Sequence, residues 1–441
     1  MFNFSQYSDL CIKCGKCIPN CTIHRINPDE VTSPRGFLEL LKGVEEGKIP
    51  LDERAKDIFE SCFLCNQCVS VCPNSLPTDF MIENVRKEIG EKFGIAPFKR
   101  AFFYLLSHRW AYDLVAKLGF IFQSCGFKIE KEKNSMRSRF NLPLIKKGRL
   151  LPSMKRKSFL RKYPEKIENP SSNSDSPRRK VAIFIGCLAN YHYTEVGDAL
   201  VNILKFLNID IFIPKKQLCC GAPAYFTGDF KTTEKLIRHN LDYFATFIDE
   251  VEAILVPEAT CTAMLKKDYR EYIEHYLPEY RELHRKIEKK IFGTTYWLHN
   301  FTDLKERLAQ LESPDPVEVT YHDACHFGKV FGIREEPRQL LSQIGEVKEM
   351  EDPDLCCGFG GITIQTEKYH LAEKEGRIKG EMIKKVDADF VSAECSACRI
   401  QITENLDKVG DNKIFKHPLE LIWEQIERGI GKRKGSGKNS Q

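Results

Sequence analysis

The sequence predicts a multidomain α+β protein, in which a helical, cysteine-rich domain precedes two tandem α/β domains that have parallel sheets and are related by an internal repeat. Three observations support this prediction. The chain has 441 residues, which corresponds to about three domains. All of its 18 cysteines except Cys125 fall into four clusters. The second half of the chain repeats one order of strands and helices.

The N-terminal domain, residues 1–95, is predicted to be helical. Apolar residues recur at helical spacing in PRGFLELLKGVEEG and again in LDERAKDIFESC, and both segments lie between the two N-terminal cysteine clusters. So much helix leaves little room for a compact β-rich domain.

Residues 96–180 combine an aromatic helix with a basic linker. The segment RAFFYLLSHRWAYDLVAKLGFIF is apolar and prone to form helix. Between Lys128 and Lys180 there are 17 Lys and Arg against 5 Asp and Glu, and the linker ends in the loop-like PSSNSDSP. We expect a solvated, flexible linker. The alternative is a surface for acidic phospholipid or for an acidic partner subunit.

Residues 181–312 and 313–428 show the same order of predicted elements. In each, a strand, a helix and a second strand precede a CCG triplet, and a helix and a third strand follow it. This alternation predicts a parallel sheet in each half, with cysteines at strand ends, where open α/β sheets place their sites. Corresponding cysteines lie at near-constant offsets, in the pairs Cys187 and Cys325, Cys219 and Cys356, and Cys261 and Cys395. The tail, residues 429–441, is expected to be disordered.

Two cysteine runs in the N-terminal domain have the spacing of iron–sulfur ligands. The run C-x2-C-x2-C-x3-C occurs as Cys11, Cys14, Cys17 and Cys21, and again as Cys62, Cys65, Cys68 and Cys72. Three closely spaced thiolates hold three corners of an iron–sulfur cube, and the fourth cysteine ligates the neighbouring cluster. We therefore assign one [4Fe–4S] cluster to Cys11, Cys14, Cys17 and Cys72, and the other to Cys62, Cys65, Cys68 and Cys21. Two zinc sites are the alternative, but zinc would leave the third cysteine of each run unused.

The cysteines of the two repeats resemble those of a known family. The first repeat offers Cys187, Cys219, Cys220 and Cys261, and the second offers Cys325, Cys356, Cys357, Cys395 and Cys398. A strand-end cysteine, a CCG triplet and a later C-x2-C resemble the cysteine-rich (CCG) domains of heterodisulfide reductase-type proteins, including the D-type subunit. Two ferredoxin motifs followed by two such domains resemble the iron–sulfur subunits of glycolate oxidase, of lactate-oxidising complexes and of anaerobic glycerol-3-phosphate dehydrogenase (its C-type subunit).

This resemblance implies one or two further iron–sulfur centres, or one zinc, in the CCG domains. The second domain has all five cysteines, whereas the first has Met264 where the fifth is expected. A thioether is a weak ligand, so four thiolates remain there for an ordinary cluster or a zinc ion.

Several histidines and one cysteine lie outside these patterns. His322 and His326 flank Cys325, and we expect them to be structural, with a hydrogen bond to a cluster ligand as the alternative. His299 and His417 are also expected to be structural. We expect the unpatterned Cys125 to lie in the core.

The sequence has no glycine-rich dinucleotide fingerprint and no P-loop, so we expect no flavin on this chain. Oxidation of a 2-hydroxy acid usually transfers hydride to an organic cofactor, whereas iron–sulfur clusters pass single electrons. We therefore expect no catalytic residue here. The chain is predicted to be the electron-transfer subunit of a flavin-dependent glycolate or lactate dehydrogenase, passing electrons from a flavoprotein partner towards quinone, with the substrate implied by the resemblance alone.

Three other functions stay open. A heterodisulfide reductase-like subunit would reduce a disulfide at a CCG-bound cluster, the C-type subunit of anaerobic glycerol-3-phosphate dehydrogenase would serve another flavoprotein, and a zinc-held scaffold would have no redox role. The net charge of +5 gives no indication of nucleic-acid binding. No apolar run reaches the roughly 18 residues of a membrane span, and the N-terminus lacks a secretory pattern. We therefore expect a cytoplasmic protein, peripheral on the inner face of the membrane if the basic linker attaches it.

Overall fold

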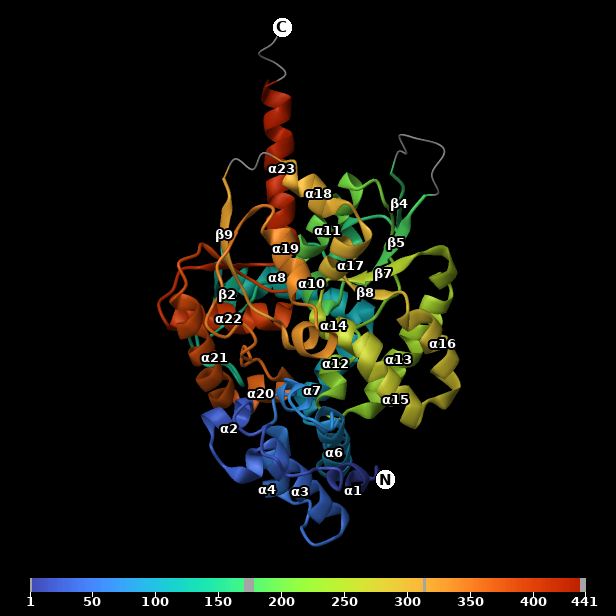
Figure 1. The fold of residues 1–441 in the computed structure, drawn as a ribbon, viewed down its shortest axis with the longest axis vertical. Coiled ribbons are helices and arrows are strands. Elements are labelled where there is room, and N and C mark those ends of the chain that lie inside the picture. The colour runs from blue at the N-terminus through green and yellow to red at the C-terminus, as the bar shows by residue number, and fades with distance from the viewer. Residues whose placement is uncertain (1, 170–177, 312–314, 437–441) are drawn as a thin grey trace.

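The computed structural model describes residues 2–169, 178–311 and 315–436. A helical N-terminal segment forms one end of the molecule, and two α/β units with separate sheets lie above it in the view of Figure 1. This combination of helices and parallel sheets confirms the mixed fold class that the sequence predicts.

The N-terminal segment is helical over the described residues 2–95, as predicted. Its helices are α1 (Phe4–Ser8), α2 (Thr22–Ile26), the 3-10 helix η1 (Glu30–Thr32), α3 (Pro34–Glu45), α4 (Glu53–Glu60), α5 (Gln67–Ser70) and α6 (Thr78–Phe93). Ser33 and Asp52 cap α3 and α4 by accepting a backbone N–H of the first turn. The apolar faces of α3, α4 and α6 meet in a core that includes Phe37, Phe59 and Met81.

Between this segment and the first α/β unit, the described part of the chain forms three helices, a small antiparallel sheet and the short strand β4. The elements are α7 (Pro97–Ser107), α8 (Arg109–Gly126), β1 (Phe127–Glu130), β2 (Ser135–Ser138), β3 (Leu150–Pro152), α9 (Phe159–Lys162) and β4 (Lys166–Ile167), and the sheet order is β1-β2-β3. The aromatic helix is therefore present as α7 and α8. The predicted PSSNSDSP loop lies outside the described residues.

The prediction of a solvated, flexible linker is wrong for the described residues of this sheet. Arg149 is buried and donates hydrogen bonds to Glu404 and Gln365, and Arg137 donates two to Asp407. Because these partners lie more than 200 residues further along the chain, the local excess of positive charge gave no indication of them. Part of the basic character of the linker therefore holds the domains together.

The first α/β unit contains a five-stranded sheet. Strands β5 (Lys180–Ile183), β6 (Asp210–Phe212), β7 (Ala253–Val256) and β8 (Ile291–Gly293) pair in parallel in the order β6-β5-β7-β8, and β4 adds to β6 in the antiparallel direction. The helices around it are α10 (Cys187–Tyr191), α11 (Thr194–Phe206), α12 (Ala222–Tyr225), α13 (Phe230–Ala245), η2 (Ile248–Glu250), α14 (Ala259–Ala263), the π-helix η3 (Met264–Asp268), α15 (Tyr269–Tyr276), η4 (Pro278–Tyr280), α16 (Arg281–Glu288), α17 (Thr294–Phe301) and α18 (Leu304–Ala309).

The second α/β unit has the same strand order. Strands β9 (Val317–Tyr321), β10 (Gly345–Val347), β11 (Phe390–Ser392) and β12 (Ile414–Lys416) form a parallel sheet in the order β10-β9-β11-β12. Its helices are the π-helix η5 (His326–Phe331), α19 (Glu335–Leu341), α20 (Gly361–Thr366), α21 (Tyr369–Lys384), α22 (Ser396–Lys408) and α23 (Pro418–Ser436). The predicted parallel sheets are thus present in both halves. That an internal repeat relates the two units stays a prediction.

Both sheets bring their cysteines to one edge. Cys187 follows β5 and Cys261 follows β7, while Cys325 follows β9 and Cys395 follows β11. Because the carboxyl ends of parallel strands meet at the same edge of a sheet, residues far apart in sequence converge there.

The helical segment is docked on both α/β units through buried polar contacts. Arg86 on α6 is buried and donates hydrogen bonds to the carbonyl oxygens of Phe59 and Cys62 within the segment and of Phe226 in the first α/β unit. Arg25, near the end of α2, pairs with the fully buried Glu375 on α21 of the second unit. These contacts fix the N-terminal cysteines relative to the other clusters.

At the C-terminal end, α23 continues to Ser436. This helix extends into the stretch from residue 429 that the sequence predicts to be disordered, and residues 437–441 lie outside the described range. Among the described residues, no helix combines the length and hydropathy that crossing a bilayer requires.

Candidate metal centres

The two N-terminal cysteine loops have the same backbone conformation. Lys13 and Gly15 in the first loop, and Leu64 and Asn66 in the second, have positive φ angles of 55°, 78°, 50° and 59°. These residues stand immediately before and after the second cysteine of each run, which is Cys14 or Cys65. A non-glycine residue in this left-handed region costs roughly 1–2 kcal/mol. The repeated left-handed turns curl each loop so that its three thiols converge.

Two small cavities collect these thiols across the loops. One cavity is lined by Cys11, Cys14, Cys17 and Cys72, with Cys68 also on its wall, and the other is lined by Cys21, Cys62, Cys65 and Cys68. The fourth cysteine of each run therefore lies beside the other loop, in the arrangement that the spacing predicts. That these cysteines ligate clusters stays a prediction.

The electrostatics of the cavity lined by Cys21 and Cys62 suit a cationic metal core. Burial raises the pKa of Cys21 to about 12 and that of Cys62 to about 11, because buried thiolates lack solvation and repel one another. Four such sulfurs become thiolates together only if a cation compensates their charge. Four soft donors around one cavity are the donor set of an iron–sulfur cluster, so the residues fit this cofactor.

The CCG triplets share a second local device. Gly221 and Gly358 have φ angles of 100° and 87°, and each donates its N–H to the sulfur of the first cysteine of its triplet, at 3.5 Å and 3.4 Å. A Cβ on Gly358 would lie 2.8 Å from the backbone nitrogen of Gly376. Glycine is therefore required there both by the backbone angle and by the close approach of α21.

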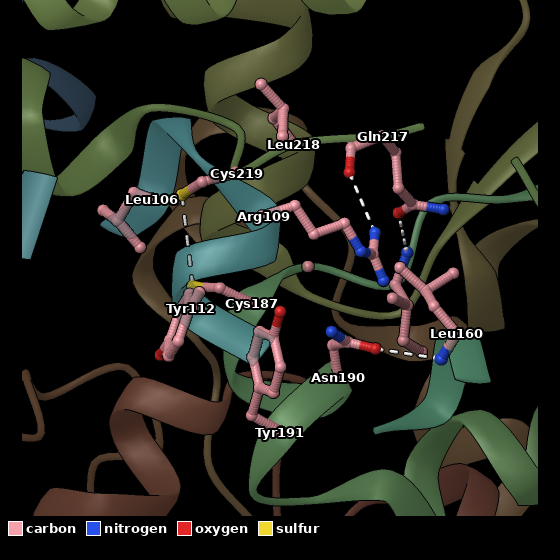
Figure 2. Close-up of a pocket in the computed structure, with 12 residues that line it drawn as sticks. Leu106, Arg109, Tyr112, Leu160, Cys187, Asn190, Tyr191, Gln217, Leu218 and Cys219 are labelled. Carbon is pink, nitrogen blue, oxygen red and sulfur yellow. Dashed lines mark hydrogen bonds between the residues drawn. The ribbon is translucent and has the colours of Figure 1, made fainter. Parts of the chain in front are cut away.

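In the first α/β unit, four thiols gather beside the carboxyl end of the sheet. The Sγ atoms of Cys187 and Cys219 lie 4.0 Å apart, and Tyr112 of α8 lines the same pocket (Figure 2). Cys220 and Cys261 lie in the same buried cluster as Cys219. Met264 is fully buried and packs beneath the CCG loop, at the position where the sequence pattern leads us to expect a fifth cysteine.

In the second α/β unit, five thiols gather in a corresponding place. The Sγ atoms of Cys357 and Cys398 are 3.2 Å apart, and the Sγ of Cys395 lies 3.6 Å from the Oγ1 of Thr260 in the first unit. Cys356 packs in one buried cluster with Cys325, and Cys65 of the second N-terminal loop packs against that cluster. The second N-terminal loop therefore contacts the CCG triplet of the second unit directly.

An apolar chamber of about 490 Å³ joins these groups. Its walls include Phe63, Phe102, Tyr112, Leu144 and Phe226. The cysteines that line it are Cys65, Cys187, Cys220, Cys261, Cys325, Cys356, Cys357, Cys395 and Cys398. The second N-terminal loop and both CCG triplets thus open onto one shared space, which no motif in the sequence indicates.

Lys329 is a site residue that the sequence analysis missed. It lies on η5 with its side chain 1% exposed, and its Nζ is 3.8 Å from the Sγ of Cys325. Burial alone lowers the pKa of Lys329, but the nearby Cys325 and Cys65 outweigh it, so that the pKa is raised. A buried ammonium among thiols would compensate the negative charge of a thiolate-bound cluster. The sequence feature that could have identified Lys329 is its position one helical turn after Cys325.

The remaining residues noted in the sequence have varied positions. Buried His417 bonds to the carbonyl oxygen of Pro257 through Nε2, and His299 contacts Gln339, as expected for structural residues. The expectation that Cys125 lies in the core is wrong. It is exposed near the end of α8, because the apolar face of this helix is itself exposed.

Comparison with known proteins supports the same division of the chain. The family model of a cysteine-rich domain, CCG, matches residues 181–266 and again residues 319–403, and that of a 4Fe-4S dicluster domain matches residues 7–76. A Lactate utilization protein A from Geobacillus thermodenitrificans is 31% identical over 246 residues, which cover 98% of that protein and 55% of this chain. The chain belongs to this family of CCG-domain iron–sulfur proteins.

Other relatives match nearly the whole chain. The Probable glycolate oxidase iron-sulfur subunit of Bacillus subtilis is 29% identical over 91% of this chain and 89% of its own length. A subunit of the CoM/CoB fumarate reductase of Methanothermobacter marburgensis is 27% identical over 93% of this chain and 71% of its own length. The relatives named as subunits belong to oxidoreductase complexes, so the chain is an iron–sulfur protein of the oxidoreductase-subunit type.

Proposed function

We propose that this protein is the electron-transfer subunit of a flavin-dependent 2-hydroxyacid dehydrogenase acting on glycolate or lactate. One observation carries the proposal: Cys65 of the N-terminal dicluster domain and Cys356 of the second CCG domain pack in one cluster and line the same chamber. Two redox centres whose ligands border one small chamber lie close enough to exchange electrons rapidly. The names of the glycolate oxidase and lactate utilization relatives favour the substrate class.

The proposed ligand sets follow the grouping of the sulfurs. One [4Fe–4S] cluster takes Cys11, Cys14, Cys17 and Cys72, and the other takes Cys62, Cys65, Cys68 and Cys21. Further centres take the five cysteines of the second CCG domain and the four of the first. The matching strand orders of the two CCG domains support an internal repeat with the boundaries 181–312 and 313–428, after a ferredoxin domain over residues 1–95.

Anaerobic purification tests these assignments. Iron, sulfide and zinc analysis with electron paramagnetic resonance (EPR) should return iron and sulfide for at least two clusters, with no stoichiometric zinc. Cys72→Ser should alter the cluster of the first loop, although Cys72 belongs to the second run. Cys125→Ser is the matched control and should change nothing. Colourless protein with only trace iron would refute the proposal.

The substrate would be oxidised on a flavoprotein partner, because clusters accept electrons singly. Affinity capture of the tagged, full-length chain from native cells, followed by flavin analysis of the captured complex, tests this point. Reduction of the clusters by glycolate or lactate should require the captured partner. If glycolate or lactate reduced the clusters of the isolated chain, the oxidation chemistry would lie on this chain and the proposal would be contradicted.

The exposed face of α8 suits delivery of electrons at a membrane surface. Trp110, Leu114, Leu118, Ile121 and Phe122 follow helical spacing, and Trp110 and Phe122 are 66% and 61% exposed. The exposed cations Lys117, Lys128, Arg139, Lys146 and Lys147 form no ion pair with any residue that the structure describes. An apolar helix face with basic residues in and after it favours peripheral binding to anionic lipid. The protein is expected to sediment with anionic vesicles but not with neutral ones. A variant with Leu118→Asp and Phe122→Asp should lose this binding.

A disulfide reductase is the second candidate, because the apolar chamber is bounded by both sets of CCG cysteines. The fumarate reductase (CoM/CoB) relative also favours it. Reduced protein mixed with candidate heterodisulfides should then release thiols, and Cys356→Ala should abolish the release. No thiol release across a panel of disulfides would exclude this function.

A further inference from the structure

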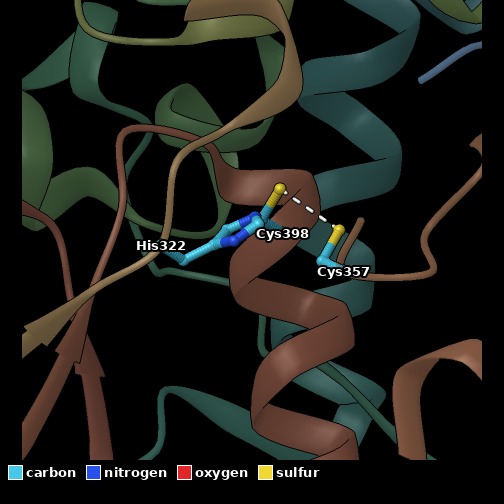
Figure 3. Close-up of side chains that lie close together, drawn as sticks. All are labelled: His322, Cys357 and Cys398. Atoms are coloured by element: carbon cyan, nitrogen blue, oxygen red, sulfur yellow. Dashed lines mark hydrogen bonds between the residues drawn. The ribbon is translucent and has the colours of Figure 1, made fainter. Parts of the chain in front are cut away.

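His322 occupies a fully buried position at the edge of the second CCG domain. It follows β9, and its backbone N–H donates to the carbonyl oxygen of Ser392 on β11, which holds the residue between two central strands. Its ring points towards Cys398, with Cys357 beside it (Figure 3). The three side chains come from three separate segments of the domain.

The hydrogen bonds of the ring indicate which nitrogen carries hydrogen. Nδ1 lies 3.1 Å from the carbonyl oxygen of Pro353. That oxygen also accepts hydrogen bonds from Lys379 Nζ and from the backbone N–H of Asp323, and a carbonyl can only accept. Nδ1 must therefore be the protonated nitrogen. In a neutral ring, Nε2 then presents a lone pair.

Nε2 is buried and has no hydrogen-bond partner among the residues that the structure describes. A ligand atom of His322 and the sulfurs of Cys357 and Cys398 all lie within 4.8 Å of one another. An unpaired buried nitrogen is costly unless something binds it. One imidazole and two thiolates form a donor set that iron and zinc use, and metal-bound histidines usually donate their other N–H to a carbonyl or carboxylate.

Two comparisons within the chain indicate that this arrangement is specific. In the first CCG domain, the residue three positions before the strand-end cysteine is Phe184, which is buried and packs edge-on against Phe244. The other histidine of the motif, His326, lies 3.3 Å from the hydroxyl of Thr260 through Nδ1 and stacks on Phe226. Of the two CCG domains, the second therefore combines five thiols with an imidazole aimed at two of them, and the first does not.

We propose that His322 is a ligand of iron in the second CCG centre, bound through Nε2 beside Cys357 and Cys398. This inference rests on the proposed function, which places an iron centre in that domain. A neutral imidazole in place of a thiolate makes the centre less negative. In iron–sulfur proteins this exchange raises the reduction potential, so the second CCG centre would attract electrons more strongly than an all-thiolate centre.

Pulsed EPR of the full-length protein tests the proposal without any substitution. Protein is produced with natural-abundance histidine and with ¹⁵N-histidine, and the second CCG centre is poised in its paramagnetic state. Directly bound nitrogen gives a strong hyperfine coupling that changes with the isotope. Only weak coupling, as expected for a hydrogen bond to a cysteine ligand, would overturn the proposal, and so would absence of isotope sensitivity.

Matched variants connect the signal to one residue. His322→Ala should lose the strong coupling, and His326→Ala should keep it. His322→Cys offers a thiolate at the same position, so it should retain the iron, lose the coupling and lower the reduction potential of the centre. A strong coupling that survives in His322→Cys would overturn the proposal.

Two cysteine variants distinguish a failure of the proposed function from a failure of the His322 proposal. Cys356→Ser and Cys357→Ser should each change the iron content or the spectrum of the second CCG centre. If neither does, the domain holds no iron centre and the proposed function fails there. If both do but no strong nitrogen coupling is found, only the role of His322 is refuted.

Discussion

Replacement of Lys329 by methionine should lower the reduction potential of the second CCG centre and of the cluster bound by Cys65. The ammonium group is buried 3.8 Å from the Sγ of Cys325, and Cys65 and Cys356 contribute to its raised pKa. Methionine keeps most of the volume of the side chain and removes its charge. Without that positive charge, adding an electron becomes less favourable.

The size of the shift follows from Coulomb's law. At 3.8 Å and an effective dielectric constant of about 20, two unit charges interact by about 4 kcal/mol. Cluster charge is spread over several atoms, and at a mean separation of about 6.5 Å the interaction is about 2.5 kcal/mol. For a one-electron step, about 1.4 kcal/mol corresponds to about 59 mV, so the potential should fall by about 100 mV.

An EPR-monitored redox titration of the anaerobic holoprotein measures this shift. Lys408→Met is the matched control, because Lys408 lies on α22 of the same domain, pairs with Glu373 and is 30% exposed. The control should change the potential little. Equal potentials in wild type and Lys329→Met, at unchanged iron content, would refute the idea that this lysine compensates cluster charge.

Three further predictions concern ligation and stability. Cys72→Ser should perturb the EPR signal of the cluster of the first loop, and an effect on the other cluster alone would contradict the crossed ligand sets. Arg86→Met should destabilise the docked N-terminal domain by about 3 kcal/mol, because buried carbonyl oxygens lose their donor. Anaerobic thermal melting measures this loss, with the exposed Arg100→Met as control. Equal melting temperatures in wild type and Arg86→Met would refute the prediction. Burial lowers the pKa of His417 to about 3. As the pH falls, His417 is therefore protonated in the unfolded chain before it is protonated in the folded one. The free energy of unfolding of wild type should therefore fall, relative to that of His417→Gln, by about 1.4 kcal/mol per pH unit from about pH 6.5 down to about 3. Chemical denaturation at a series of pH values measures this difference. The same pH dependence in both proteins would contradict the prediction.

Local sequence patterns predicted much of the fold. Helical spacing around Phe37 and Phe59 indicated the helical N-terminal segment, and alternating strands and helices indicated the two parallel sheets. These patterns succeed because periodicity and turn residues act over a few positions along the chain. The basic linker failed for the opposite reason, since Arg137 and Arg149 find their partners on α22.

The same distinction applies to the candidate centres. Cysteine spacing by itself determined which thiols group within each loop, because a left-handed turn on either side of the middle cysteine closes a loop of three ligands. Only the tertiary structure decided that Cys65 packs in one cluster with Cys356 and Cys325, that the buried charge of Lys329 lies beside Cys325, and that His322 is aimed at two sulfurs. These contacts arise where the carboxyl ends of parallel strands and a docked helical domain converge, and no short stretch of sequence encodes that convergence.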